Sequence, residues 1–287
     1  MSTFFTMTTT TRFRMVAAAL TVALSSTVAL AASPTEAFSK FTVGSAKTVD
    51  HAAWSQLLAG YVKPGADGLN RVDYKAWKAK DHATLKAYVA ALEKSDVASL
   101  DKPEQFAFWA NLYNAATINV VLDKYPVTSI KEINLGGGLK TLVTGGPWQA
   151  KIVTVGGQGL SLDNIENDIM RAIFKDPRVH YSVNCASVGC PNLGTVAFTG
   201  ATLDTILDAN ARAFINSPRG FAFEGGKIKA SSIYDWFKAD FGGSVDGVLA
   251  HARKYATPEL KARLTGKTAI DSYDYDWALA STPPASG

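Results

Sequence analysis

The stretch PEQFAFWANLYNAATINVVLDK, at residues 103–124, decides the fold. Its apolar residues recur at helical spacing, and one stripe of them contains Phe106 and Trp109. A second stripe contains Phe108 and Leu112, which makes the predicted helix apolar almost all round. A helix without a polar face belongs in the interior of a domain. We therefore expect residues 103–124 to form a buried central helix.

Shorter elements are predicted on both sides of this helix. Helical spacing and capping residues predict helices over 51–61, 83–93, 161–174, 202–216 and 232–242, with two more before an aromatic segment at 273–277. Glycine-rich turns predict hairpins centred on 156–157 and 224–226, and alternation predicts a strand over 178–184. This mixture predicts a single α+β domain, in which the central helix packs with further helices and short antiparallel hairpins.

The first residues are predicted to direct export. Arg12 and Arg14 precede an apolar run at 15–24, and small residues follow up to Ala31. This is the pattern of a signal peptide cleaved after Ala31, which implies a periplasmic or secreted protein with no membrane span after cleavage. The alternative, a membrane anchor, needs a longer uninterrupted apolar run. The predicted organisation is a signal peptide at 1–31, a lead-in with a short helix at 32–70, the α+β domain at 71–280 and a disordered tail at 281–287.

Composition excludes several classes of protein. The 287 residues are 47% hydrophobic and 19% charged, which suits a large buried core and not a disordered chain. The formal net charge is +4, and removal of the signal peptide leaves only a small basic surplus. We therefore expect no nucleic-acid partner.

The only two cysteines, Cys185 and Cys190, lie in a short loop of small residues. In an exported protein such a pair most simply forms a disulfide. One alternative keeps Cys185 as a nucleophilic thiolate activated by His180, with Asn184 or Glu166 orienting the imidazole, for acyl transfer or amide hydrolysis. The other is a zinc site made by the two cysteines, His180 and Glu166, although the cysteine spacing is at the edge of what zinc sites use. No other cofactor is predicted.

The predicted strand at 178–184 carries a polar face. Alternation places His180, Ser182 and Asn184 on one side, directly before the cysteine loop. The face belongs either to a functional site or to an edge strand that faces solvent.

Glu166 stands within the apolar stripe of the predicted helix at 161–174. A buried carboxylate needs a partner, and Arg178, Arg171 or His180 could supply it. Pairing with His180 would orient a general base. The alternative is that Glu166 closes a capping box from Asp163 and stays in contact with water.

The central helix also carries two polar residues, Asn111 and Asn114. Buried amides must be hydrogen-bonded, which favours a role in bracing loops over contact with a ligand. Both nevertheless remain candidate ligand contacts, together with Ser182, Asn184 and Arg178. Tyr273, Tyr275 and Trp277 are candidates for a ligand surface, unless they simply pack the C-terminal segment.

Several of these segments together resemble the domain of unknown function 547 family. They are 108–115, 165–166, 176–180, 184–191, 232–242 and 275–277, within a resemblance that runs from about Val72 to Leu279. The resemblance implies that Glu166, His180 and the cysteine loop stand where the family's motif residues stand. It implies no established reaction. Where many members have histidine after the helix glutamate, this chain has Asn167.

These observations predict an exported soluble protein that binds an unidentified small molecule or peptide, or acts in the cell envelope, with a loop braced by a Cys185–Cys190 disulfide. The alternative is a thiol-dependent hydrolase or acyltransferase that uses Cys185 and His180, so that the sequence leaves open whether the protein is an enzyme.

Overall fold

The computed structural model of the protein describes residues 1–3, 32–136 and 145–283. Its contacts separate residues 1–31 from one compact unit, Ala32–Gly287. The predicted signal peptide and its cleavage site lie outside the described residues and stay predictions. Within the described part of the chain, no helix is long and apolar enough to cross a membrane.

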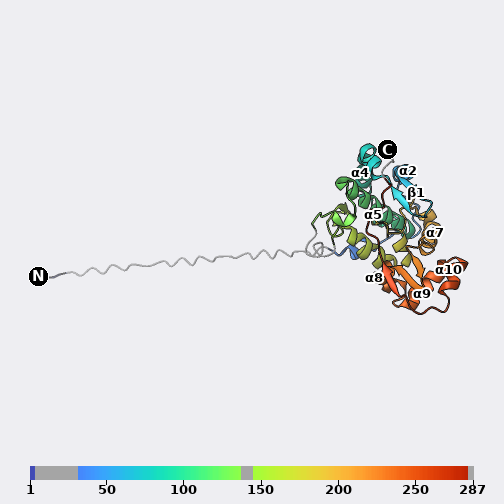
Figure 1. The fold of residues 1–287 in the computed structure, drawn as a ribbon. Coiled ribbons are helices and arrows are strands. Elements are labelled where there is room, and N and C mark those ends of the chain that lie inside the picture. Colours follow the sequence, from blue (N-terminus) through green and yellow to red (C-terminus); the bar gives the residue numbers. More distant parts are fainter. Residues whose placement is uncertain (4–31, 137–144, 284–287) are drawn as a thin grey trace. The chain divides into compact units, whose positions relative to one another are not determined.

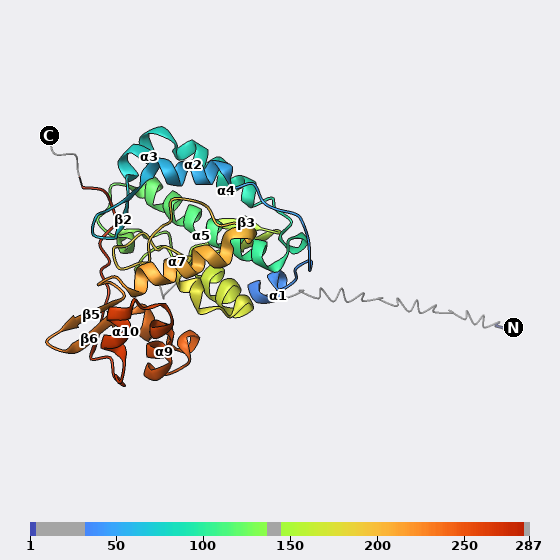
Figure 2. The same cartoon turned by 90° about the vertical axis from the view of Figure 1, so that its right-hand side faces the viewer.

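The predicted central helix is present as α5 (Lys102–Lys124). Asp101 caps its first turn by accepting a hydrogen bond from the backbone N–H of Glu104. Both predicted stripes are buried, and the side chains of Phe108, Trp109 and Leu112 have no exposed surface. Figures 1 and 2 show α5 in the middle of the compact unit, with helices on either side of it. The prediction of a buried central helix is confirmed.

The elements before α5 are α1 (Pro34–Phe38), α2 (Ala52–Tyr61), β1 (Val62–Pro64), β2 (Asn70–Val72), α3 (Tyr74–Lys80), α4 (His82–Leu92) and η1 (Val97–Ser99). Of these, α2, α3 and α4 cover one side of α5, whereas α1 packs against the helical segment at 164–174 on another side (Figure 2). The helices predicted at 51–61 and 83–93 correspond to α2 and α4. The lead-in also contains α1, which starts with a capping box between Ser33 and Glu36 and packs Phe38 against Trp109.

The elements after α5 build its other side and a second apolar cluster. They are η2 (Ile130–Glu132), β3 (Val153–Val155), β4 (Gln158–Leu160), η3 (Asn164–Phe174), η4 (Pro177–Tyr181), η5 (Gly200–Thr202), α7 (Leu203–Ile215), β5 (Phe221–Glu224), β6 (Lys227–Ser231), α8 (Ile233–Trp236), η6 (Lys238–Phe241), α9 (Val245–Tyr255), α10 (Pro258–Leu264) and β7 (Ser272–Asp274). The hairpins β3–β4 and β5–β6 are antiparallel, as predicted, whereas β7 adds to β6 in parallel. The α+β fold class is confirmed.

Three predicted elements differ from the structure. The single helix predicted at 232–242 is divided into the short α-helix α8 and the 3₁₀-helix η6. The strand predicted at 178–184 is wrong, because η4 is a 3₁₀-helix. Asp176 accepts a hydrogen bond from the backbone N–H of Arg178, and Pro177 occupies the first helical position, so that local capping overrides the alternation. The helix predicted at 161–174 is present, but from Asn164 to Phe174 it is a π-helix.

The C-terminal segment 275–282 runs as a strap beside the cysteine loop. The backbone N–H of Ala280 donates to the carbonyl of Ala186, and that of Leu279 donates to the carbonyl of Thr128. Farther along, the N–H of Thr282 donates to the carbonyl of Val72. The predicted disordered tail at 281–287 therefore begins with hydrogen-bonded residues, and its last part, 284–287, lies outside the described residues.

Truncation of one buried side chain on α5 tests how much this core contributes to stability. Leu112→Ala leaves a cavity beside fully buried neighbours. We expect a loss of about 2–5 kcal/mol in the free energy of unfolding, measured by urea denaturation. Val43→Ala, at an apolar residue that is 85% exposed, is the control and should change stability by less than about 0.5 kcal/mol. Equal effects of the two substitutions would contradict the central position of α5.

Candidate functional site

A cavity of about 750 Å³ opens beside the cysteine loop. Its volume lies in the range of small-molecule sites. It is bounded by α5, η3, η4, the cysteine loop, α8 and the C-terminal strap. Its lining residues are Tyr113, Lys131, Trp148, Gln149, Asp163, Glu166, Asn167, His180, Val183, Cys185, Cys190, Pro191, Ile233, Trp236, Phe237, Tyr275 and Trp277.

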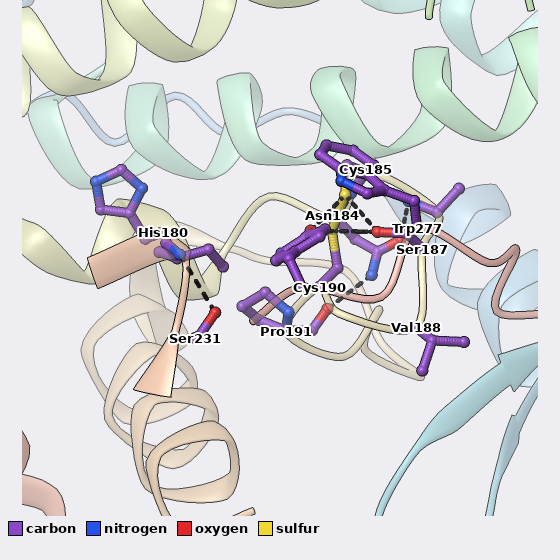
Figure 3. Close-up of a disulfide and its surroundings, with 12 residues drawn as sticks. His180, Asn184, Cys185, Ser187, Val188, Cys190, Pro191, Ser231 and Trp277 are labelled. Carbon is purple, nitrogen blue, oxygen red and sulfur yellow. Dashed lines mark hydrogen bonds between the residues drawn. A yellow bond between two sulfur atoms is a disulfide. The ribbon is translucent and has the colours of Figure 1, made fainter. Parts of the chain in front are cut away.

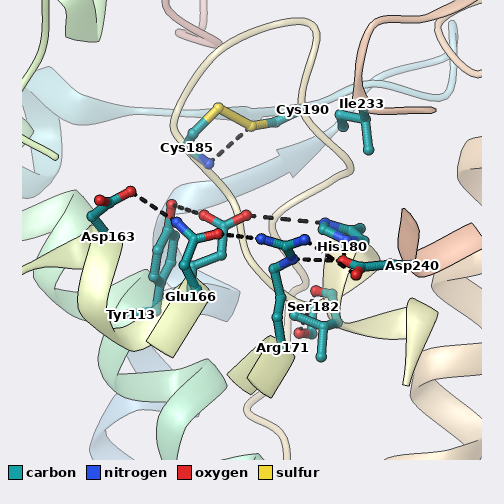
Figure 4. A network of polar contacts seen from close by, with 12 residues as sticks. Tyr113, Asp163, Glu166, Arg171, His180, Ser182, Cys185, Cys190, Ile233 and Asp240 are labelled. Carbon is teal, nitrogen blue, oxygen red and sulfur yellow. Dashed lines mark hydrogen bonds and ion pairs between the residues drawn. A yellow bond between two sulfur atoms is a disulfide. The ribbon is translucent and has the colours of Figure 1, made fainter. Parts of the chain in front are cut away.

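A polar network forms one end of the cavity (Figure 4). The Nε2 atom of His180 lies 2.7 Å from the carboxylate of Asp240, and its Nδ1 atom lies 4.0 Å from the carboxylate of Glu166. The hydroxyl of Tyr113 donates to Glu166 over 3.2 Å. Arg171 completes the network by pairing with Asp240 at 2.5 Å. The predicted proximity of Glu166 and His180 is therefore found, even though the strand that suggested it is absent.

Local structure positions each member of this network. Glu166 and Arg171 extend from η3, and His180 extends from η4, where its ring stacks on Phe237 at 4.3 Å between ring centroids. The imidazole is almost fully buried, whereas 17% of the Glu166 side chain is exposed. The third predicted partner, Arg178, instead pairs with three aspartates away from this network, which are Asp176, Asp204 and Asp208.

The capping-box alternative for Glu166 is not what the structure shows. The backbone N–H of Asn164 instead donates to the hydroxyl of Ser161, which caps this turn. The side chain of Asp163 accepts a hydrogen bond from Asn167, and Asn167 in turn accepts one from Arg171. Asp163, Asn167 and Arg171 thus form one ladder of polar side chains along η3, and Asn167 belongs to the cavity lining.

Burial and charge shift the ionisation of the network. Burial raises the pKa of Glu166 to about 7, against the lowering effects of the Tyr113 hydroxyl and the Arg171 charge. Burial also lowers the pKa of His180, although Asp240 opposes the shift. For Asp240, burial acts to raise the pKa, but hydrogen bonds from His180 and Arg171 outweigh it and hold the pKa well below its ordinary range. Near neutral pH, both the protonated and the ionised forms of Glu166 are therefore populated.

The tautomer of His180 follows from this arrangement. A neutral imidazole carries one proton, and the ionised Asp240 accepts it from Nε2. The Nδ1 atom is then an acceptor that faces Glu166. A carboxyl group with one exchangeable proton and an unprotonated imidazole nitrogen thus lie side by side at the end of the cavity.

One side of the cavity, which we call the aromatic wall, is formed by Trp148, Trp236, Tyr275 and Trp277. Trp236 stacks on Trp277 at 5.8 Å between ring centroids and contacts Tyr275 at 4.9 Å. Trp148 lies 6.2 Å from Trp277, and the ammonium of Lys131 lies 5.1 Å from the Trp277 ring. Of the predicted aromatic surface, Tyr275 and Trp277 line the cavity, whereas Tyr273 is outside the described lining.

The predicted Cys185–Cys190 disulfide is present, and both cysteines line the cavity. In this state neither sulfur is a thiolate, so that the nucleophile of the thiol-dependent alternative does not exist. The zinc alternative meets the same obstacle, because zinc binds cysteine as thiolate. Within the described ranges, no group of three or more histidine, cysteine or acidic residues is placed to hold a metal ion.

The three asparagines predicted as ligand contacts instead hydrogen-bond the backbone. Asn111 exchanges two hydrogen bonds with the backbone of Phe198. Asn114 donates to the carbonyl of Ser182 and accepts from the N–H of Asn184. Asn184 itself donates to the carbonyl of Pro191 across the base of the cysteine loop. The five predicted ligand contacts, Asn111, Asn114, Arg178, Ser182 and Asn184, are outside the lining that the described residues form.

Sequence reasoning missed several residues of the site. Asp240 lies 60 residues from His180 in the chain, and only the fold shows that they pair. Trp236 was detectable as a large aromatic residue in a predicted helix, and the structure leaves it 50% exposed at the cavity. Tyr113 belongs to the predicted central helix and is buried in the core, and its hydroxyl also reaches Glu166.

Comparison with known proteins gives one match. Residues 97–215 match the family described as "Protein of unknown function, DUF547". The matched segment contains α5, η3, η4 and the cysteine loop. The predicted resemblance is thus confirmed over this segment, and the similar-looking segments at 232–242 and 275–277 lie beyond it. No curated protein and no solved structure matches the chain.

Removal of the Glu166 carboxylate tests its raised pKa. The folded protein keeps Glu166 protonated up to about pH 7, whereas the unfolded chain releases the proton near the ordinary pKa of 4.5. Glu166 therefore reduces stability as the pH rises between these values. We expect Glu166→Gln to exceed the wild type by about 1–3 kcal/mol in unfolding free energy at pH 8 but not at pH 4.5.

Urea denaturation at the two pH values measures this difference. Glu259→Gln, at an exposed glutamate on α10, is the matched control, with little change at either pH. If Glu166→Gln has the same effect at pH 4.5 and pH 8, the carboxyl group titrates normally and the prediction is wrong.

Proposed function

For a chain in which residues 97–215 match the DUF547 family, we propose export across a membrane and binding of a small molecule or short peptide in the aromatic-walled cavity. One observation carries the proposal. The cavity of about 750 Å³ has the aromatic wall on one side and the Glu166–His180–Asp240 network at its end. Apolar walls with a few convergent polar groups are typical of ligand sites.

The aromatic wall selects a ligand with a flat or ring-shaped face. Trp236 and Trp277 present broad indole surfaces, and Trp236 keeps half of its surface exposed. Burial of such a surface by a ligand is favourable at about 25 cal/mol per Å² of apolar area. Stacking against indole rings adds geometric selectivity.

The polar end selects hydrogen-bonding groups. Glu166 donates when protonated and accepts when ionised, and its pKa of about 7 makes both forms accessible near neutral pH. Asn167 and Gln149 add amide groups to the lining, and Lys131 adds a positive charge near Trp277. The ligand therefore combines a ring face with polar substituents.

Two features support the export part of the proposal. The first 31 residues have the pattern of a cleavable signal peptide. The Cys185–Cys190 disulfide suits an oxidising compartment such as the periplasm or the cell exterior. Expression of the full chain in a bacterium, followed by intact mass measurement of the periplasmic and secreted fractions, should give a mature protein that begins at Ala32. An uncleaved protein found only in the cytoplasm contradicts export.

A second candidate function is general acid–base catalysis on the bound ligand. It is favoured by the distance of 4.0 Å between Glu166 and His180 and by the pKa of about 7 of the glutamate. Glu166 would donate a proton to a leaving group, and His180, oriented by Asp240, would assist a water molecule. Glu166→Gln separates the two functions, because it abolishes turnover in an enzyme and retains affinity in a binding protein.

Substitution of the exposed tryptophan tests the cavity. A thermal-shift screen of amino sugars, short peptides and aromatic acids identifies a ligand, because a ligand at 100 times its Kd stabilises the fold by about 2.7 kcal/mol. We expect Trp236→Ala to weaken binding of that ligand by about tenfold or more, measured by isothermal titration calorimetry.

The matched control is Phe41→Ala, which removes an aromatic residue that is 38% exposed and outside the cavity lining that the described residues form. This variant should bind as the wild type does. Undiminished affinity of Trp236→Ala places the ligand elsewhere and refutes the proposed site.

A further inference from the structure

The disulfide in the cavity wall is surrounded by hydrogen-bond donors (Figure 3). The backbone N–H of Cys185 lies 2.9 Å from the Sγ atom of Cys190. The hydroxyl of Tyr275 lies 2.9 Å from the Sγ of Cys185 and 3.0 Å from that of Cys190. The hydroxyl of Ser187 lies 3.0 Å from the Sγ of Cys185 and donates its hydrogen to the hydroxyl of Tyr275 over 3.2 Å. Two donors, the N–H of Cys185 and the hydroxyl of Tyr275, thus converge on the two sulfur atoms.

These donors suit a thiolate better than a disulfide. Disulfide sulfur is a weak acceptor, whereas hydrogen bonds to a charged acceptor are roughly twice as strong as neutral ones. Donors and positive charge around a cysteine lower its pKa and favour its reduced form. Arg219 adds such a charge, because its guanidinium donates to the carbonyls of Cys190 and Val188 in the same loop.

We propose that Cys185 and Cys190 are a redox-active pair that exchanges electrons with a thiol-bearing small molecule or peptide in the cavity. This inference rests on the proposed function, since it assumes that the cavity admits a ligand. It adds to that function a chemical class of ligand and a reaction.

The loop keeps its shape without the disulfide bond. The N–H groups of Val188 and Gly189 donate to carbonyls of the C-terminal strap, at 2.8 Å each. Asn184 joins both ends of the loop, because it accepts from the N–H of Ala186 and donates to the carbonyl of Pro191. A disulfide across a separation of five residues also closes a short loop, which limits its entropic contribution to stability. Reduction therefore leaves the site assembled.

Exposure determines which sulfur reacts first. Cys185 is partly exposed to the cavity, whereas Cys190 is buried, with 3% of its surface exposed. An incoming thiolate attacks the Sγ of Cys185, the Cys185–Cys190 bond breaks, and Cys190 leaves as a thiolate. The N–H of Cys185 and the hydroxyl of Tyr275 are already in place to stabilise this leaving group.

The second step completes the exchange. Another thiol of the ligand, or a second ligand molecule, attacks the ligand sulfur of the mixed disulfide and releases Cys185. Two thiols of the ligand are thereby oxidised to one disulfide, and the protein disulfide is reduced to two cysteines. The two protons lost by the ligand thiols are taken up by the two cysteine sulfurs. Electrons and atoms balance without another reactant.

Equilibration with glutathione tests the proposal. The mature protein is incubated in buffers of varied ratio of reduced to oxidised glutathione, quenched with acid and alkylated, and the reduced fraction is read from intact mass. We expect Tyr275→Phe to lower the equilibrium constant for reduction by about tenfold, because it removes a hydrogen bond that is stronger to the charged sulfur of a thiolate than to a disulfide. The pKa of the most acidic thiol, followed by thiolate absorbance, should rise in the same variant.

Tyr273→Phe is the matched control. It removes a phenol hydroxyl from the same segment, and that hydroxyl has no hydrogen-bond partner among the described residues. The wild-type equilibrium constant and thiol pKa should persist in this variant, and thermal unfolding verifies that both variants fold. Equal constants for Tyr275→Phe and Tyr273→Phe, or a wild-type disulfide that resists excess glutathione while the protein stays folded, would falsify the proposal.

Two measurements on the wild-type protein distinguish failure of this inference from failure of the proposed function. Glutathione exchange reports on the sulfur environment, whereas the calorimetric affinity for the screened ligand reports on the cavity. Ligand binding with an inert disulfide refutes the redox role alone. A reducible disulfide that responds to Tyr275→Phe supports the redox role even where Trp236→Ala leaves ligand affinity unchanged.

Discussion

The burial of α5, which extends from Glu104 to Leu122 apart from Asn119, is the constraint on which the other features depend. A helix buried in this way can satisfy its polar side chains only inside the protein. Asn111 and Asn114 do so by hydrogen-bonding the backbone of the chain that leads into and follows the cysteine loop. Tyr113 does so by donating to Glu166. The same helix that forms the core thus positions both the disulfide loop and the carboxylate of the cavity.

Much of this arrangement could be predicted from local patterns. Helical spacing revealed α5, and glycine pairs revealed the hairpins. The cysteine spacing, in a chain predicted to be exported, favoured the disulfide that the structure contains. Glu166 was identified because a carboxylate interrupts an apolar stripe. The alternation at 178–184 misled, because the capping of η4 by Asp176 is a stronger local signal than three alternating residues.

The sequence could not reveal contacts between residues that lie far apart in the chain. Burial shifts the pKa values of Glu166 and His180, and the charges of Arg171 and Asp240 modify these shifts. The segments η3, η4 and η6 that carry these residues meet only through tertiary packing. The aromatic wall likewise gathers Trp148, Trp236 and Trp277 from three parts of the chain. No periodicity connects these residues, so that sequence spacing could indicate each aromatic residue but not their convergence.

The C-terminal strap has a consequence for the order in which the site is assembled. Ribosomes make proteins from the N-terminus, so that the strap emerges after α5, η3 and the cysteine loop have been synthesised. The strap nevertheless supplies Tyr275 and Trp277 to the cavity and pairs with the loop through Ala280 and Ala186. A nascent chain therefore contains the core before it contains a finished cavity. Premature termination before residue 275 would yield a protein whose aromatic wall lacks Tyr275 and Trp277, so that an intact cavity requires complete synthesis.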